Sequence, residues 1–207
     1  MALEAYRRLV VQVDNVAEPL FRRYRPHLQC RRGCYFCCAN LTILPVEHFN
    51  LATWLARQGR PVPAHPGVER KWPAQDRSRE GLLPVATGER DSSCPLLGGE
   101  GECTVYPARP LICRVHGVPL AYPVFEYDQN GKLVNDAERM DLWCDLNFTG
   151  ISDEGAAAYF DENGRVDMAA IDRELEKINE DFLLSEEGAP YADLGRLTME
   201  NLAGTAT

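Results

Sequence analysis

Eight cysteines, spread over two clusters and one isolated position, constrain this chain more than any other feature of its sequence. The first cluster reads CRRGCYFCC, the second reads CPLLGGEGECTVYPARPLICR, and the isolated cysteine lies in DLWCDL. Reducing compartments discourage structural disulfides, so this many cysteines in a chain that is not exported indicates metal binding or redox chemistry. We therefore predict that segments far apart in the sequence supply the ligands of a metal centre. The candidate ligands are Cys30, Cys34, Cys37, Cys38, Cys94, Cys103, Cys113 and Cys144.

The remainder of the sequence predicts a soluble protein of the cytoplasm. The N-terminal residues carry charges throughout and do not resemble a secretory signal. No apolar run approaches the roughly 20 residues that a membrane-spanning helix needs. The net charge of -9 would repel nucleic-acid phosphate. We expect a metal ion as partner, no nucleic acid and no membrane, and we leave open a protein partner or substrate.

The periodicity of apolar residues predicts a mainly α protein with a small β hairpin, which is an α+β fold. Apolar residues recur at steps of three and four from Leu3 to Tyr24 and again from Met168 to Phe182, as in amphipathic helices. Pro19 is expected to bend or split the first helix. Another helix is predicted to begin near Pro45 and to stop around Gly59.

We predict one domain over residues 1–207, with irregular segments organised around a cysteine-ligated metal centre. Its parts are an N-terminal helix at 1–25, a motif-bearing region at 30–144 and a C-terminal helix at 166–184. Within the motif-bearing region, residues 59–93 read as an extended connection, because they are rich in Pro and Gly and lack periodicity. Asn130-Gly131 predicts the turn of a hairpin between Val124 and Val134. The tail after Ser185 is expected to be loose.

The close spacing of the first cluster lets its thiols converge, either on one face of a helix or in a loop that enters a helix. Gly33 disfavours the helix. The neighbours Cys37 and Cys38 would be strained at two corners of one tetrahedral ion, so one of them is expected to serve another metal atom or an outer position. Zinc and iron both accept sets of four cysteines. The expected cofactor is iron, mononuclear or as an iron-sulfur cluster, or zinc, and the surplus of thiols favours iron or a multinuclear site.

Several neighbours of the cysteines have two interpretations. Cys144 follows a tryptophan and is as consistent with a buried apolar residue as with a ligand. Four arginines could lower thiol pKa values, or could be ordinary surface residues. His116 is a substitute ligand, with His27 a weaker one, and Glu47, His48 and His116 are the acid-base candidates if the protein is an enzyme. The arginines are Arg31, Arg32, Arg109 and Arg114.

These residues resemble the YkgJ-like cysteine-cluster family, a zinc- or iron-chelating domain with the motif CxxCxxCC. Cys30 to Cys38 match its first block, with three residues instead of two between Cys30 and Cys34. CPLL is similar to its CPxL block, and CTVYPARPLICR is similar to its CxxYxxRPxxCR block. The family includes flagellin lysine methylases, so the resemblance also implies a methyltransferase as an alternative.

A second pattern in the same residues is that of radical S-adenosylmethionine enzymes. Cys30, Cys34 and Cys37 spell CxxxCxxC, and Gly98-Gly99-Glu100 matches the GGE motif of those enzymes. Such enzymes need a long alternation of strands and helices to build a partial barrel, and this sequence offers one helix, a Pro-rich connection and more cysteines. The pattern therefore does not decide the function.

The leading hypothesis is a protein that chelates iron or zinc through soft thiolates. One alternative is a metal-dependent enzyme, such as a protein lysine methyltransferase or another enzyme that uses S-adenosylmethionine. A second alternative is a thiol redox switch that joins Cys34 and Cys37. The sequence identifies no catalytic residue.

Overall fold

A computed structural model describes residues 1–38, 41–60, 94–127 and 133–199. Its helices and two small sheets confirm the predicted α+β class. No helix within these ranges is long and apolar enough to cross a membrane. The elements are α1 (Ala2–Tyr24), η1 (Arg25–His27), β1 (Thr42–Ile43), α2 (Pro45–Arg57), η3 (Tyr106–Ala108), α3 (Leu111–Val115), β2 (Leu120–Tyr127), β3 (Leu133–Leu142), α4 (Asp153–Asn163), β4 (Val166–Asp167), α5 (Met168–Leu183), η4 (Ala189–Tyr191) and β5 (Leu197–Thr198).

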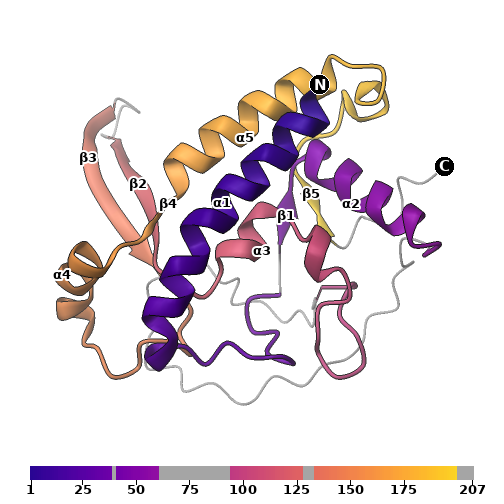
Figure 1. Ribbon diagram of the computed structural model, residues 1–207. Coiled ribbons are helices and arrows are strands. Elements are labelled where there is room, and N and C mark those ends of the chain that lie inside the picture. The colour runs from indigo at the N-terminus through magenta and orange to yellow at the C-terminus, as the bar shows by residue number, and fades with distance from the viewer. Residues whose placement is uncertain (39–40, 61–93, 128–132, 200–207) are drawn as a thin grey trace.

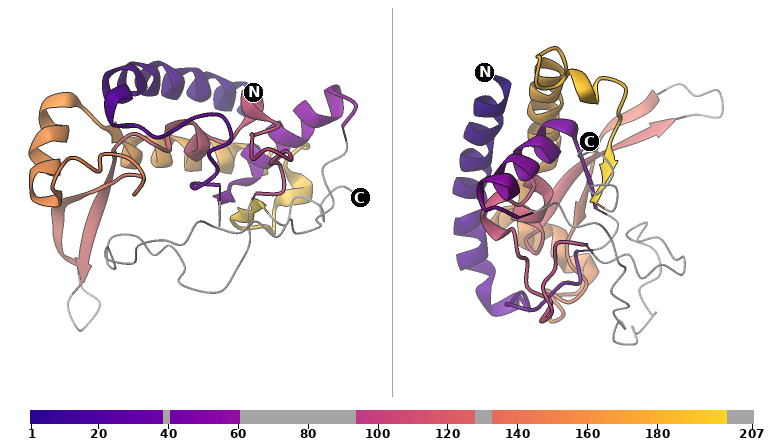
Figure 2. Two further views of the ribbon diagram at one scale, coloured as in Figure 1. Left: turned by 90° about the horizontal axis from the view of Figure 1, so that it is seen from below. Right: turned by 90° about the vertical axis from the view of Figure 1, so that its right-hand side faces the viewer.

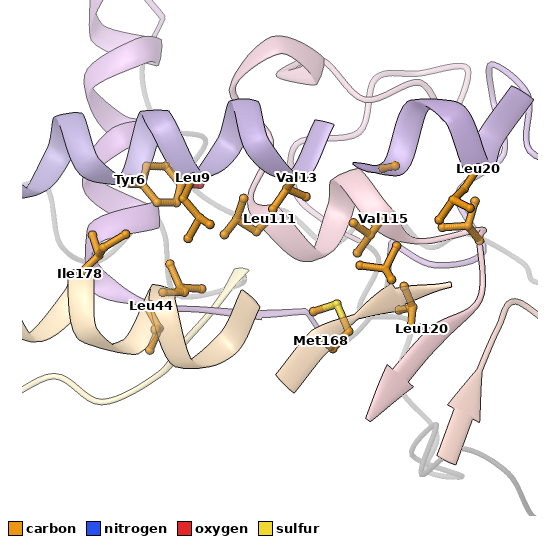
Figure 3. Close-up of a cluster of buried hydrophobic side chains, with 14 of the residues drawn as sticks. Tyr6, Leu9, Val13, Leu20, Leu44, Leu111, Val115, Leu120, Met168 and Ile178 are labelled. Atoms are coloured by element: carbon orange, nitrogen blue, oxygen red, sulfur yellow. The ribbon is translucent and has the colours of Figure 1, made fainter. Parts of the chain in front are cut away.

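The two longest helices, α1 and α5, lie side by side and are the framework of the molecule (Figure 1). Both are confirmed predictions, and α1 continues through Pro19 without splitting. The side chain of Asp167 accepts a hydrogen bond from the Ala170 N–H and so caps α5. The apolar face of α1 packs onto α3 and α5 (Figure 3). The buried residues of that face are Tyr6, Leu9, Val13, Ala17, Leu20 and Tyr24.

The predicted hairpin strands are β2 and β3, which pair antiparallel, and β4 adds a parallel pairing to β2. The strand order is β3-β2-β4. The hairpin projects away from the helices (Figure 2). The predicted turn at Asn130-Gly131 lies outside the described residues, as does residue 61 onward of the predicted extended connection.

The prediction of a loose C-terminal tail is wrong for residues 189–199. This segment contains η4 and β5, and β5 pairs with β1 through Ile43 and Leu197. Leu197 and Met199 are buried in a second apolar cluster with Leu51 and Leu55 of α2. In the sequence, the alternation of Leu197 and Met199 covers only three residues, which is too short to indicate a strand. The strand β5 therefore depends on its pairing with the distant β1.

Glu47, in the first turn of α2, is almost completely buried and joins two helix starts. One carboxylate oxygen accepts the Leu44 N–H at 3.0 Å, and the other accepts the Leu111 N–H at 2.9 Å. Leu111 begins α3, the helix that carries Cys113. Glu47 therefore fixes α2 against the helix that holds one of the candidate ligands, and both oxygens of this acid-base candidate are engaged in backbone hydrogen bonds.

The Glu47→Gln variant is expected to lose about 1–3 kcal/mol of unfolding free energy, because an amide group offers one acceptor oxygen to two backbone N–H groups. Burial raises the pKa of Glu47 above its ordinary value. Folding therefore favours its protonated form, and the stability of the wild type should fall as the pH rises from the ordinary pKa toward the raised one. Urea unfolding at several pH values tests both effects. Glu174→Gln, on the exposed face of α5, is the control, and equal losses in the two variants would contradict the prediction.

Candidate metal centre

The first cysteine cluster folds as two successive turns after η1, so the helical interpretation is wrong, and the element that follows the loop is β1, before α2 begins. The Cys34 N–H donates to the Arg31 carbonyl at 2.9 Å, and the Cys38 N–H donates to the Tyr35 carbonyl at 2.8 Å. Gly33 has a φ of +86°, and a Cβ there would lie 3.0 Å from the Glu100 carbonyl oxygen. A close approach of two backbones at a positive φ requires glycine at this position.

The second cluster lies beside the first and is hydrogen-bonded to it (Figure 1). The Cys94 N–H donates to the Cys38 carbonyl at 2.7 Å. A tight turn then folds the chain back, with an antiparallel bridge between Leu97 and Cys103. Cys113 follows on α3. The Gly-rich turn that the sequence offered thus brings Cys94 and Cys103 to the same side as the first cluster.

Cys37 affects the pKa values of several other cysteines. Burial raises the pKa of four cysteines, for Cys144 to about 12, and negative charge on Cys37 raises each of these pKa values further. These four are Cys30, Cys103, Cys113 and Cys144, and Cys37 raises the pKa of Cys38 as well. Negative charge on Cys34 likewise raises the pKa values of Cys30 and Cys144. Negative charge on Cys94 raises those of Cys38 and Cys113. The charges of Cys34, Cys37 and Cys94 thus act on the pKa values of cysteines in both clusters and on that of Cys144.

The adjacent Cys37 and Cys38 share a hydrogen bond, and this bond separates their acidities. It lowers the pKa of Cys37 and, together with burial, raises the pKa of Cys38. His116 lowers the pKa of Cys37 further through a hydrogen bond and its positive charge. A thiolate is the form that binds metal, so a lowered pKa favours Cys37 as a ligand.

The donor set fits a soft metal cation. Burial and the neighbouring thiolates raise the pKa of Cys113 well above its ordinary value, and burial raises that of Cys103. Crowded thiolates repel one another in a poorly hydrated site, and a bound cation offsets that repulsion. Within the described ranges, no three His, Cys, Asp or Glu side chains are already arranged to hold a metal ion, so the thiols are neighbours without a preset ligand geometry.

The four flanking arginines have different roles. Arg114 is buried and donates to Asp14 at 2.7 Å, and to the Pro107 and Arg109 carbonyls, so it ties the second cluster to α1. Arg109 lies over the Tyr106 ring and lowers the pKa of Cys103, as predicted for a cationic neighbour. Arg31 and Arg32 are exposed.

His116 is hydrogen-bonded to Cys37. The His27 ring is held by the aromatic cluster: it stacks on Phe148, and its Nε2 lies 3.1 Å from the Tyr159 hydroxyl. His48 is buried with its Nδ1 3.0 Å from the Tyr191 hydroxyl. His48 and Glu47 thus pack into the framework.

Two residues at the cysteines were missed by sequence reasoning. Asn147 is completely buried, and its Nδ2 lies 3.4 Å from the Cys30 Sγ. Gly117 has a φ of +113°, and a Cβ there would lie 2.8 Å from the same sulfur. Neither residue belongs to a cysteine motif, and the only signal in the sequence is that Asn147 follows Cys144 by three positions and Gly117 follows His116.

A comparison with protein-family models decides the family. The model of the CxxCxxCC domain, described as "Putative zinc- or iron-chelating domain", matches residues 29–145, which is more than half of the chain. The chain belongs to the CxxCxxCC family. The match contains the eight cysteines and His116 and confirms the resemblance that the motifs predicted. No curated protein and no solved structure matches the chain.

Proposed function

We propose that this member of the CxxCxxCC family chelates iron through its clustered cysteines, as a centre with more than one metal atom. The observation that supports the proposal is that the region matched by the family model contains eight cysteines from three separate segments, and that the charge of Cys37 acts on cysteines of all three. One tetrahedral ion takes four ligands, so eight thiols exceed what a single zinc or iron ion uses. Soft thiolates select iron-sulfur centres and zinc over hard cations such as magnesium.

The thiols form two groups that share Cys37. Cys30 and Cys144 respond to the charge of Cys34 and Cys37. In the second group, negative charge on Cys94, Cys37 and Cys103 raises the pKa of Cys113. Negative charge on Cys37, Cys113 and Cys94 raises the pKa of Cys38. Each group with Cys37 offers at least four sulfur donors, and His116 offers a nitrogen. This division supports a centre with two or more metal atoms and gives the adjacent Cys37 and Cys38 different positions in it.

The chain's own residues prepare the centre. Cys38 and His116 stabilise the Cys37 thiolate, Arg109 favours the Cys103 thiolate, and burial at Cys113 excludes water. A bound metal would supply a cross-link among three segments, and an iron centre could also carry an electron. Because ligand binding orders these segments, part of its free energy is folding free energy.

The enzyme and redox alternatives have less support from the geometry. Two of the three acid-base candidates, Glu47 and His48, form hydrogen bonds within the framework. The thiol pair joined by a hydrogen bond is Cys37 with Cys38, whereas the redox hypothesis used Cys34 with Cys37. The proposal therefore stays with metal chelation.

Protein purified without oxygen is expected to contain more than one iron per chain together with acid-labile sulfide, and to absorb visible light. Elemental analysis, a sulfide assay and an absorption spectrum measure these properties. If the protein is colourless and contains stoichiometric zinc and no sulfide, the metal that it chelates is zinc and not iron. Protein that contains no metal after expression with iron and zinc supplements, and that binds neither metal when they are added, would overturn it.

A further inference from the structure

Asn147 lies in the turn that leads from β3 to α4, two residues beyond the range that the family model matches. Its backbone N–H donates to the Cys144 carbonyl at 2.8 Å. The next residue, Phe148, has a φ of +58° and donates its N–H to the His27 carbonyl at 2.9 Å. The turn is therefore fixed both to the isolated cysteine and to the segment that precedes the first cluster.

The amide of Asn147 has one possible orientation. Its Oδ1 accepts the Gln29 N–H at 2.7 Å, and its Nδ2 donates to the Gly117 carbonyl at 2.8 Å. A backbone N–H can only donate and a carbonyl can only accept. Exchanging the two amide atoms would therefore place two donors against each other at Gln29 and two acceptors against each other at Gly117. The remaining hydrogen of Nδ2 therefore points at the Cys30 Sγ, 3.4 Å away.

The sulfur of Cys30 is thus an acceptor from a buried donor. A neutral thiol is a weak acceptor, whereas a thiolate that binds metal is a much better one. Gly117 lies beside the amide and also borders the sulfur: a Cβ at Gly117 would lie 2.8 Å from the Cys30 Sγ and 3.6 Å from the Asn147 Nδ2. These contacts hold Cys30 in place although an extra residue separates it from Cys34.

We propose that Asn147 is a positioning residue for the metal centre: it donates an N–H to the Cys30 sulfur and keeps Cys30 in the ligand set. This inference rests on the proposed function. Hydrogen bonds to ligand sulfurs also tune the potential of iron-sulfur centres, and outer partners of this kind affect metal affinity by about 10–100-fold. Asn147 also joins the segments of Cys30, Cys144 and His116, so one amide couples three parts of the centre.

The test is a titration of metal-free protein with Co²⁺ without oxygen, followed by the thiolate-to-metal absorption and by competition with a chelator. The Asn147→Ala variant is expected to bind Co²⁺ about 10–100-fold more weakly than the wild type. Asn179→Ala is the matched control, because the Asn179 amide is also buried and accepts the Val46 N–H, but between α5 and α2. Equal affinities of the two variants would overturn the inference while leaving the proposed function intact.

A double-mutant cycle shows whether Asn147 acts through Cys30. In a Cys30→Ser background, Asn147→Ala should cause no further loss of Co²⁺ affinity, and additive losses would contradict the inference. A wild type that binds no Co²⁺ would overturn the proposed function and this inference with it.

Alkylation of the wild type gives a readout that needs no variant to fold. Cys30 is exposed, so iodoacetamide should label it in metal-free protein and should fail to label it in the Co²⁺-loaded form. Equal labelling of Cys30 in both forms would overturn its place in the ligand set. In loaded Asn147→Ala, Cys30 should become labelled while Cys37 stays protected, which general unfolding would not produce.

Discussion

The Cys37→Ser variant is expected to lose most of its bound metal and to unfold in the region that the cysteines join. Cys37 is the thiol that both groups share, and it is the one that Cys38 and His116 stabilise as a thiolate. Structural zinc sites supply roughly 10–16 kcal/mol of folding free energy in small peptides, so loss of a central ligand should remove a large part of such a contribution. Metal analysis and thermal unfolding of the purified variant measure the two effects. Cys113→Ser should behave similarly.

Val105→Ala is the control for this prediction. Val105 is buried in the same second apolar cluster as Cys103 and Cys113, so its truncation weakens the same region without removing a thiol. We expect this variant to be less stable but to keep the metal content of the wild type. A folded Cys37→Ser or Cys113→Ser protein with unchanged metal content would show that the cysteine is not a ligand.

The Phe160→Ala variant is expected to lose about 3–5 kcal/mol of unfolding free energy, the cost of truncating a fully buried aromatic side chain. Phe160, in α4, is 0% exposed. Its ring centroid lies 5.2 Å from those of Trp143 and Phe148, in edge-to-face contacts that add to the apolar burial. This aromatic cluster holds the turn that carries Cys144 and Asn147 against the end of α1.

Chemical denaturation of Phe160→Ala and of a surface control measures this cost. Leu184→Ala removes a large apolar side chain that is 88% exposed, so its unfolding free energy should change by less than about 0.5 kcal/mol. If Phe160→Ala is destabilised no more than Leu184→Ala, the aromatic cluster does not stabilise the fold.

The helices were predictable because their signals are local. The periodic apolar residues of α1 and α5 and the cap at Asp167 are readable within one or two turns. The pairing of β1 with β5 was not predictable, because each strand has two residues and depends on a partner more than 150 residues away. The roles of Glu47 and His48 were likewise hidden, since their residue types suit chemistry and only burial shows that they hold the framework.

For the candidate site, the sequence alone determined the chemistry of the donors: eight cysteines and one histidine within the region that the CxxCxxCC family model matches. The tertiary structure decided that Cys37 is hydrogen-bonded to Cys38 and His116, and that His27 lies in the aromatic cluster instead. It also decided that Asn147, 117 residues from Cys30, donates to the sulfur of Cys30. The physical reason is that one residue of the sequence is enough to supply a thiol. The groups that surround this thiol, exclude water from it and donate hydrogen bonds to it come from segments that only folding brings together.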